Sequence, residues 1–235
     1  MKVFAQVSKK YYDQTARRVN YQNAQVYFSK RVTLLEANLD VKQKKIKFLD
    51  AGCGEGTFLA MVRKKHPGLA LYGFDLSARQ IKLAKQKLKK VPLQVADAGQ
   101  MPYQDNFFDV IFINALLHHV ESIPVVIKEI VRVCRPGGKI ILIEPNRLNP
   151  LVFASSLLKE HEHGGLRMSH RYLKRLLQKY NFRSIKFFRL NSILFPFQSF
   201  PGPGAFKFFY HLENWPYFPS FLKSHFAFVI QLATK

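Results

Sequence analysis

A glycine-rich turn between a short apolar run and a helix-like segment constrains this chain more than any other feature. The turn has the sequence Asp50-Ala51-Gly52-Cys53-Gly54-Glu55-Gly56. Residues 46–49 predict a short buried strand before it, and residues 57–62 predict the first turns of a helix after it. Because glycine has no β-carbon, alternate glycines let the backbone turn sharply and approach a ligand closely. The following helix N-terminus adds unpaired N–H groups that suit an anionic or polar ligand group.

Strand-like and helix-like patterns alternate along the chain after residue 46, which favours a parallel sheet built from βαβ units. Further strands are predicted at residues 69–74, 93–96, 109–113, 139–144, 184–188 and 226–232. Helices are predicted from Ala78 to about Lys90 with Ser77 as the N-cap, from Ile123 to Cys134, and from Ser169 to about Tyr180. Residues 135–138, Arg-Pro-Gly-Gly, predict a turn. Residues 1–45 predict a mostly helical extension.

Polar side chains follow the next predicted strands at their carboxyl ends. Asp75 ends the second strand, Asp97 followed by Ala98 ends the third, and Asn114 ends the fourth. Ligands of open α/β sheets bind at the carboxyl ends of the strands, so these groups are expected around one site with the glycine turn. Asp75 is placed to accept hydrogen bonds from ribose hydroxyls, and Asp97 with Ala98 is placed for an adenine edge.

The glycine spacing separates two cofactor classes. A dinucleotide-binding turn of the form G-x-G-x-x-G needs glycine at position 57, where this chain has Thr57. The spacing D-x-G-x-G-x-G instead resembles the first motif of class I methyltransferases that depend on S-adenosylmethionine (SAM). The resemblance covers roughly residues 46–145. Besides the glycine turn, the matching segments are Gly73-Phe74-Asp75-Leu76-Ser77, Ala96-Asp97-Ala98, Phe107-Phe108-Asp109-Val110, Leu117-His118-His119-Val120 and the Arg132–Gly138 segment.

The similarity is closest to the group that contains quinone-biosynthesis and other small-molecule or lipid methyltransferases. It implies a Rossmann-like, seven-stranded, mostly parallel α/β sheet with helices on both faces. It also implies SAM as cofactor and S-adenosylhomocysteine as product. Gly52, Cys53, Gly54 and Gly56 would hold the methionine part of SAM, Asp75 with Leu76 the ribose, Asp97 and Ala98 the adenine, and the Asn114 backbone would lie near the sulfonium. Asp50 would order the glycine turn or bind the amino group of SAM.

His118 and His119 follow the fourth strand, where acceptor and cofactor would meet. A histidine near neutral pH is a natural base for an alcohol or amine acceptor, whereas an acidic phenol needs none. His119 is the preferred candidate, because entry into a helix should point only one of the two rings inward. The alternative is that both histidines are structural or line the pocket without taking part in catalysis.

A second polar cluster, Glu160-His161-Glu162-His163, precedes Arg167 and His170. Its alternatives are substrate contact, a solvated loop or a metal site, and the absence of cysteines disfavours metal. We expect no metal. The segment from Glu144 to Pro150 resembles the E-P-N…N-P stretch of some members of the group and predicts a substrate-side loop.

Basic and aromatic residues outside the core bear on the acceptor. The net charge is +22, with eleven Lys and Arg against three Asp and Glu in residues 1–48 and twelve against three in residues 151–235. Residues 191–225 are dense in Phe, Tyr and Pro and predict an aromatic lid, or else a small core packed on the sheet. Together these features favour a small-molecule or lipid-like acceptor and contact with an anionic membrane.

Two other functions remain alternatives. An RNA methyltransferase would use the basic flanks for phosphates, but Asn114-Ala115-Leu116-Leu117 replaces the D/N-P-P-F/Y motif common in nucleic-acid amino methyltransferases. A non-catalytic SAM-binding scaffold is disfavoured by the intact glycine turn with its two acidic partners.

The composition predicts one domain over residues 1–235, with residues 1–45 as a helical extension, 46–145 as the SAM-binding core, and 146–170 and 191–225 as substrate-side loops. Cys53 and Cys134 cannot form a disulfide framework, and residues 1–10 lack the apolar run of a signal peptide. A cytoplasmic protein is expected, either free or peripheral to the inner face of the membrane.

Overall fold

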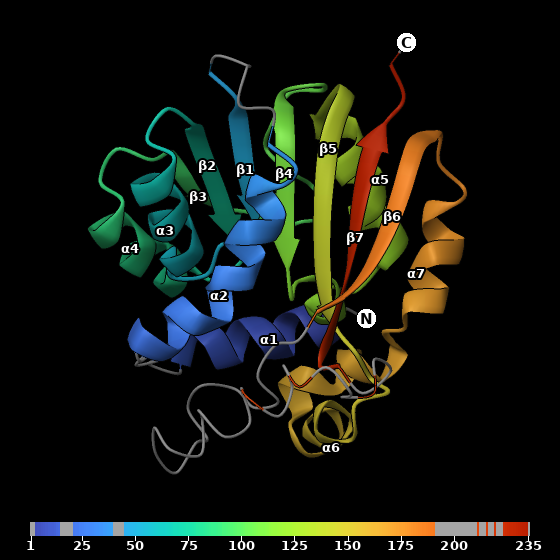
Figure 1. Cartoon of the computed structure of the whole chain (residues 1–235). Helices are drawn as coiled ribbons and strands as arrows, with labels where there is room; N and C mark the ends of the chain where they lie inside the picture. Colours follow the sequence, from blue (N-terminus) through green and yellow to red (C-terminus); the bar gives the residue numbers. More distant parts are fainter. Residues whose placement is uncertain are drawn as a thin grey trace.

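Seven strands form one sheet in the computed structural model, which describes residues 3–14, 21–39, 45–190 and 223–234 together with His211, Trp215 and Pro219. The strand order is β3-β2-β1-β4-β5-β7-β6 (Figure 1). The strands are β1 Lys47–Ala51, β2 Ala70–Asp75, β3 Leu93–Val95, β4 Phe108–Asn114, β5 Cys134–Pro145, β6 Phe182–Leu190 and β7 His225–Leu232. Strands β1 to β5 are parallel, and β7 is antiparallel to both neighbours. The predicted Rossmann-like, mostly parallel sheet is confirmed.

Helices cover both faces of the sheet (Figure 1). They are α1 Val3–Gln14, α2 Tyr21–Glu36, α3 Thr57–Lys65, α4 Ala78–Lys87, α5 Ile123–Val133, α6 Pro150–Leu158 and α7 His170–Leu177, with the 3₁₀ helices η1 Leu117–His119 and η2 Glu160–Arg167. The helical N-terminal part is present as predicted. Ser77 caps α4, because its hydroxyl accepts a hydrogen bond from the Gln80 N–H.

Alternate residues of the strands feed two separate hydrophobic cores. Ile111 and Ile113 of β4 pack with α5 and α7 on one face, whereas Val110 and Phe112 pack with α2, α3 and α4 on the other. Successive strand side chains point to opposite faces, so a strand buried on both faces needs an unbroken apolar run. This explains why β4 could be recognised in the sequence.

The structure differs from the sequence prediction at the start of β5. The predicted turn at residues 135–138 is part of β5, which begins at Cys134, and the pairing with β4 shifts register between Phe108 and Val110. The last strand of the chain, β7, lies between β5 and β6. Most of the predicted aromatic lid, residues 191–225, lies outside the described residues. Among the helices that the structure describes, none combines the length and apolar character needed to cross a bilayer.

Candidate functional site

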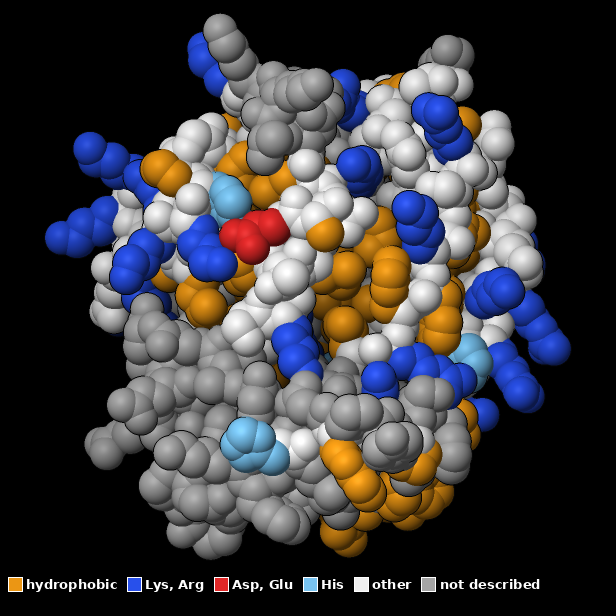
Figure 2. All heavy atoms as spheres, viewed as in Figure 1, with side chains coloured by type: hydrophobic (Ala, Val, Ile, Leu, Met, Phe, Trp, Pro, Cys, Tyr) orange, Lys and Arg blue, Asp and Glu red, His pale blue; other side chains and the backbone are white. Residues whose placement is uncertain are grey.

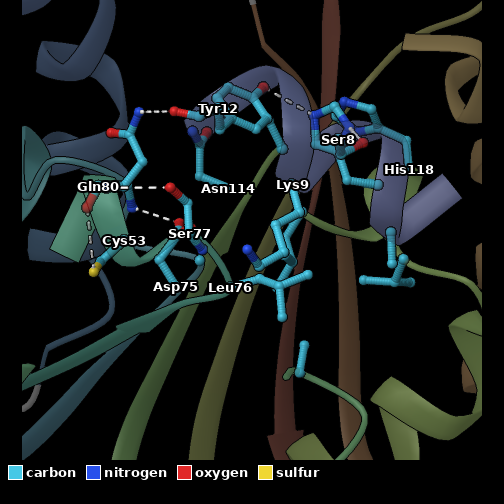
Figure 3. Close-up of a pocket in the computed structure, with 18 of the residues that line it drawn as sticks. Ser8, Lys9, Tyr12, Cys53, Asp75, Leu76, Ser77, Gln80, Asn114 and His118 are labelled. Atoms are coloured by element: carbon cyan, nitrogen blue, oxygen red, sulfur yellow. Dashed lines mark hydrogen bonds between the residues drawn. The ribbon is translucent and has the colours of Figure 1, made fainter. Parts of the chain in front are cut away.

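A cavity of about 850 Å³ lies at the carboxyl ends of the parallel strands, next to α1. Its walls come from the glycine turn, the loops after β2, β3 and β4, and the helices α1, α2 and α6. Figure 3 shows Tyr12 of α1 lying between Gln80 on one side and Ser8 and His118 on the other. Pockets of this size hold small organic ligands, and here the volume suffices for two of them side by side.

The glycine turn is held by hydrogen bonds to β2. The N–H groups of Gly52 and Cys53 both donate to the Phe74 carbonyl, each at 2.9 Å. Gly52, Gly54 and Gly56 have φ of 75°, 53° and 75°, in the left-handed region that favours glycine. A β-carbon on Gly54 would find only Gln80 Oε1, at 3.9 Å, so it would project into the cavity. The turn is therefore a backbone cradle that a side chain would fill.

The Asp75 carboxylate ties this turn to the start of α4. One oxygen accepts from the Gly54 N–H and the other from the Ser77 N–H, both at 2.9 Å. Asp75 also lines the cavity, so its carboxylate faces a ligand bound there. Asp97, beyond β3, accepts from the Gly99 N–H at 2.7 Å and is exposed at the cavity edge.

The structure brings nearly all the predicted cofactor residues to this one cavity. Gly56 is the exception: it is buried, and a β-carbon there would meet Ala84 and Leu88 at 3.0 Å. Its place is at the N-terminus of α3, where it closes the turn. The predicted residues on the cavity wall are Asp50, Gly52, Cys53, Gly54, Asp75, Leu76, Asp97, Ala98 and Asn114.

Burial changes the protonation of the groups beneath the turn. Burial, reinforced by the nearby Asp75 charge, raises the pKa of Asp50 to about 8. The same causes, with Asp50 added, raise the pKa of the Cys53 thiol well above its usual range. Cys53 is thus a neutral packing residue, whereas Asp50 is an acid that a cation in the cavity would ionise.

The loop after β4 contains a strained residue and an arginine-bound amide. Ala115 has φ of 55°, which is uncommon for a residue with a side chain. The Asn114 side-chain oxygen accepts from Arg31 Nε at 2.6 Å, and Arg31, on α2, is fully buried. The arginine fixes the end of β4 at the cavity wall.

His118 is held between two glutamates. Its Nδ1 lies 2.7 Å from Glu144 Oε2 and its Nε2 lies 3.3 Å from Glu162 Oε2. Glu144, fully buried at the end of β5, also accepts from the N–H groups of Leu116 and Leu117. Burial alone would lower the pKa of His118, but the two carboxylates outweigh it and raise that pKa to about 10. His118 is therefore an imidazolium at neutral pH and has no free lone pair.

His119 has a different set of contacts. Its Nδ1 lies 3.0 Å from both the Ser8 hydroxyl and the His161 carbonyl oxygen, and its Nε2 lies 3.3 Å from the Tyr12 hydroxyl. Since a carbonyl oxygen only accepts, these contacts assign the proton of the neutral ring to Nδ1. Nε2 is then the basic atom. The expectation that only one ring points inward was wrong, because both rings line the cavity with centroids 3.8 Å apart.

Helix α1 crosses the cavity and joins its two ends, which the sequence did not indicate. Near the start of α4, the Asp13 carboxylate accepts from the Ser77 hydroxyl at 2.5 Å, and the Asp13 carbonyl accepts from Arg79 at 3.1 Å. At the other end, Tyr11 stacks on His161 with ring centroids 3.5 Å apart. The Tyr11-Tyr12-Asp13 triplet was visible in the sequence, but nothing local in it signals a cavity.

The Glu160–His163 cluster forms the first half of η2, and its side chains divide between the cavity and the surface. Glu162 lines the cavity, and its contacts with His118, His119 and His161 lower its pKa in spite of burial. His163 instead bonds to the Leu157 carbonyl at 3.2 Å. Donor atoms of His118, His119 and Glu162 lie within 4.8 Å of one another, a spacing that also suits a metal ion. The hydrogen bonds described above engage all three side chains, which accounts for the arrangement.

Comparison with known proteins agrees with this architecture. Residues 49–142 match the model of a family described as a methyltransferase domain. A demethylmenaquinone methyltransferase from Staphylococcus aureus is 31% identical over 156 residues, which is 65% of this chain and 62% of that protein. The same enzyme from Anoxybacillus flavithermus is 33% identical over 111 residues, 45% of this chain and 47% of that protein. The chain thus spans about half to three fifths of the length of the curated relatives it matches.

Solved structures of methyltransferases share the fold. The geranyl diphosphate C-methyltransferase of Streptomyces coelicolor, solved with Mg²⁺, a geranyl thiolodiphosphate and S-adenosylhomocysteine, superposes with a TM-score of 0.69 at 16% identity, covering 97% of each chain. A phosphoethanolamine N-methyltransferase of Haemonchus contortus, solved with SAM, gives 0.70 at 16% identity over 97% of this chain and 60% of that one. At such identities the likeness shows the fold alone.

Proposed function

We propose that this chain is a SAM-dependent methyltransferase that acts on a small, apolar, lipid-like acceptor. The observation that carries the proposal is the backbone cradle at Gly54, open to a cavity that also contains Asp50, Asp75 and Asp97. These groups fit the parts of SAM: an acid for the amino group, a carboxylate for the ribose and a polar edge for the adenine. The family match over residues 49–142 and the relatives that methylate demethylmenaquinone support the same cofactor.

The residues proposed to hold the cofactor divide by the group they face. Gly52, Cys53 and Gly54 would hold the methionine part, with Gly56 closing the turn, and Asp50 would pair with the amino group. Asp75 and Leu76 would hold the ribose, and Asp97 and Ala98 the adenine. Asn114 would lie beside the sulfonium. When bound, SAM supplies an activated methyl group, so the protein mainly has to align the acceptor and exclude water.

The histidines at the other end would differ in role. His119 Nε2 is the basic atom and would take the acceptor proton, with the Tyr12 hydroxyl fixing the ring. His118 is already protonated between Glu144 and Glu162, so it would act through its charge, favouring an acceptor oxygen that becomes anionic. This arrangement supports O-methylation or C-methylation of an enol or phenol-type acceptor.

The acceptor class follows from the cavity wall. Beyond the histidines the wall is mainly apolar, and it extends along α6 through Val152, Ala154 and Leu158. Phe28 of α2 adds an aromatic ring to the cavity wall. Apolar walls with a few convergent polar groups bind largely hydrophobic ligands. A quinone or isoprenoid-like acceptor fits this wall, and a strongly basic protein that collects such an acceptor is expected to contact an anionic membrane.

Transfer of labelled methyl from SAM into a fractionated cell extract tests the proposal. Label in the organic phase is the expected result, and the Gly54→Val variant run in parallel should leave that phase unlabelled. Label in RNA would replace the acceptor proposal with RNA methylation by the basic flanks. Calorimetric SAM binding without label in any fraction would favour the non-catalytic scaffold, and no SAM binding would overturn the whole proposal.

A further inference from the structure

Helix α6 forms one wall of the cavity and also presents apolar side chains to solvent. Val152 and Ser156 face inward, whereas Phe153 and Leu157, one helical turn apart, are 46% and 52% exposed. Leu158, at the end of the helix, is 84% exposed although it also lines the cavity. The rim of the cavity is thus continuous with an exposed apolar surface.

The exposed surface has a defined extent and contains no charge. Residues 148–158 carry no charged side chain. We call the group formed by Leu148, Phe153, Leu157 and Leu158 the apolar ridge; the exposed fraction of Leu148 is 50%. Figure 2 shows these hydrophobic atoms gathered at the lower edge of the molecule, where Figure 1 places α6. A contiguous apolar patch on a protein surface marks an interaction site.

Basic side chains flank the apolar ridge in the sequence and lie above it on the surface (Figure 2). Arg147 and Lys159 flank α6 in the sequence. Residues 169–190, which form α7 and β6, carry seven Lys and Arg and no Asp or Glu. In Figure 2 Lys and Arg side chains occupy the flank of the molecule above the ridge, where α7 and β6 lie in Figure 1. Apolar residues that insert beside cations match the interface of an anionic bilayer, with its acyl chains below its negative headgroups.

We propose that the apolar ridge of α6 docks on the surface of an anionic lipid bilayer, with α7 and β6 against the headgroups, so that a lipid-like acceptor enters the cavity past Leu158. The inference rests on the proposed function for the identity of the acceptor but not for the docking itself. Docking would place the cavity mouth at the depth where the apolar part of such an acceptor lies, and it would spare the acceptor a passage through water.

Sedimentation with phosphatidylcholine vesicles, with and without phosphatidylglycerol, tests the docking. The full chain should bind the anionic vesicles, and raised salt should weaken binding. The double variant Phe153→Glu, Leu157→Glu should bind about a hundredfold less, because both exposed side chains lose the gain of apolar burial and neither lines the cavity. The matched control is Val95→Glu, since Val95 is 51% exposed on β3, at the opposite edge of the sheet.

A second double variant separates the contribution of the basic side chains from that of the inserted apolar side chains. Lys174→Glu, Arg175→Glu on α7 should lower binding to anionic vesicles about tenfold and leave the weak binding to neutral vesicles unchanged. Vesicle binding that the α6 variants do not alter would overturn the proposal, as would no binding by the wild type. SAM affinity, measured by calorimetry without vesicles, should be equal in all these proteins, so a failure of docking is distinguishable from a failure of the cofactor assignment.

Discussion

The two ends of the cavity are built in different ways. At the proposed cofactor end the wall is formed by the left-handed backbone of one turn and by carboxylates at neighbouring strand ends. At the acceptor end the polar side chains come from α1, η1, β5 and η2, which are up to 153 residues apart, as for Ser8 and His161. The first end is local in sequence and the second exists only after folding.

This difference teaches which part of such a cavity can vary. The cofactor end depends on left-handed backbone at Gly52 and Gly54 and on the parallel register of β1 and β2. The acceptor end depends on side chains that several elements contribute, and each can change without altering the sheet. We therefore expect substitutions to separate cleanly: cofactor affinity should respond at one end and turnover at the other.

The largest effect is expected from His119→Asn. Loss of a general base lowers the rate by about 10²- to 10⁴-fold, while SAM affinity should stay within twofold or so of wild type because the cradle is untouched. Single-turnover kinetics and calorimetry measure the two quantities. The control is His66→Asn, since His66 pairs with Glu36 away from the cavity. Normal turnover in the His119 variant would show that alignment alone suffices.

The next largest effect is expected from Gly54→Val, which should lower SAM affinity where the His119 variant lowers turnover. The valine side chain would occupy the cavity in a backbone conformation with φ of 53°, and SAM affinity should fall about a hundredfold, because overpacking costs about 1–3 kcal/mol. Gly68→Ala is the control, since a β-carbon there meets nothing within 4 Å. Circular dichroism should show both variants folded. Unchanged SAM affinity in the valine variant would refute the cofactor assignment.

The sequence could bring most of the proposed cofactor residues to one cavity because its signals there are local. The glycine spacing, the apolar run of β4 and the serine cap of α4 each depend on neighbours within a few residues. The same reasoning placed Asp75 and Asp97 correctly at strand ends. It grouped Gly56 with the other turn glycines, whereas Gly56 does not line the cavity and a β-carbon there would meet Ala84 and Leu88. Periodicity cannot distinguish a glycine that faces a ligand from one that faces a helix.

The acceptor end could not be predicted, for a physical reason. Whether His118 is a base or a cation depends on Glu144 and Glu162, which reach it across 26 and 44 residues of chain and raise its pKa. No spacing rule links a histidine to carboxylates so distant. Tyr12 likewise meets His119 only because α1 crosses the cavity. The sequence could identify the histidines as candidates but not assign their roles.

A smaller effect is expected on the pH dependence of SAM affinity, through Asp50 at the proposed cofactor end. With its pKa raised to about 8, Asp50 of the free protein is protonated at pH 6, and pairing with a cationic amino group would ionise it. SAM affinity should therefore rise by up to about tenfold per pH unit between pH 6 and 8, with proton release measurable by calorimetry in buffers of different ionisation enthalpy. Asp50→Asn should remove this dependence.

The raised pKa of Asp50 also makes the free energy of unfolding depend on pH. Between about pH 4 and pH 8 the folded state binds a proton at Asp50 that the unfolded state has lost, so this residue lowers the free energy of unfolding as pH rises. Asp50→Asn should flatten that part of the stability profile, whereas Asp105→Asn, at an exposed ion pair with Arg132, should not. For the affinity prediction above, a wild-type SAM affinity that does not change between pH 6 and 8 would contradict the pairing of Asp50 with the amino group of SAM.

The smallest effect tests the one element that spans both ends. Tyr12 contacts His119 through its hydroxyl at 3.3 Å and the Gln80 side chain through its carbonyl at 3.5 Å. Tyr12→Phe removes only the first contact, so turnover should fall about fivefold, since a neutral hydrogen bond contributes about 1 kcal/mol, and SAM affinity should not change. Tyr11→Phe, which keeps the aromatic ring that stacks on His161, is the control. A Tyr12→Phe variant that loses SAM affinity as well would show that α1 couples the two ends, and the separation drawn above would then fail at this helix.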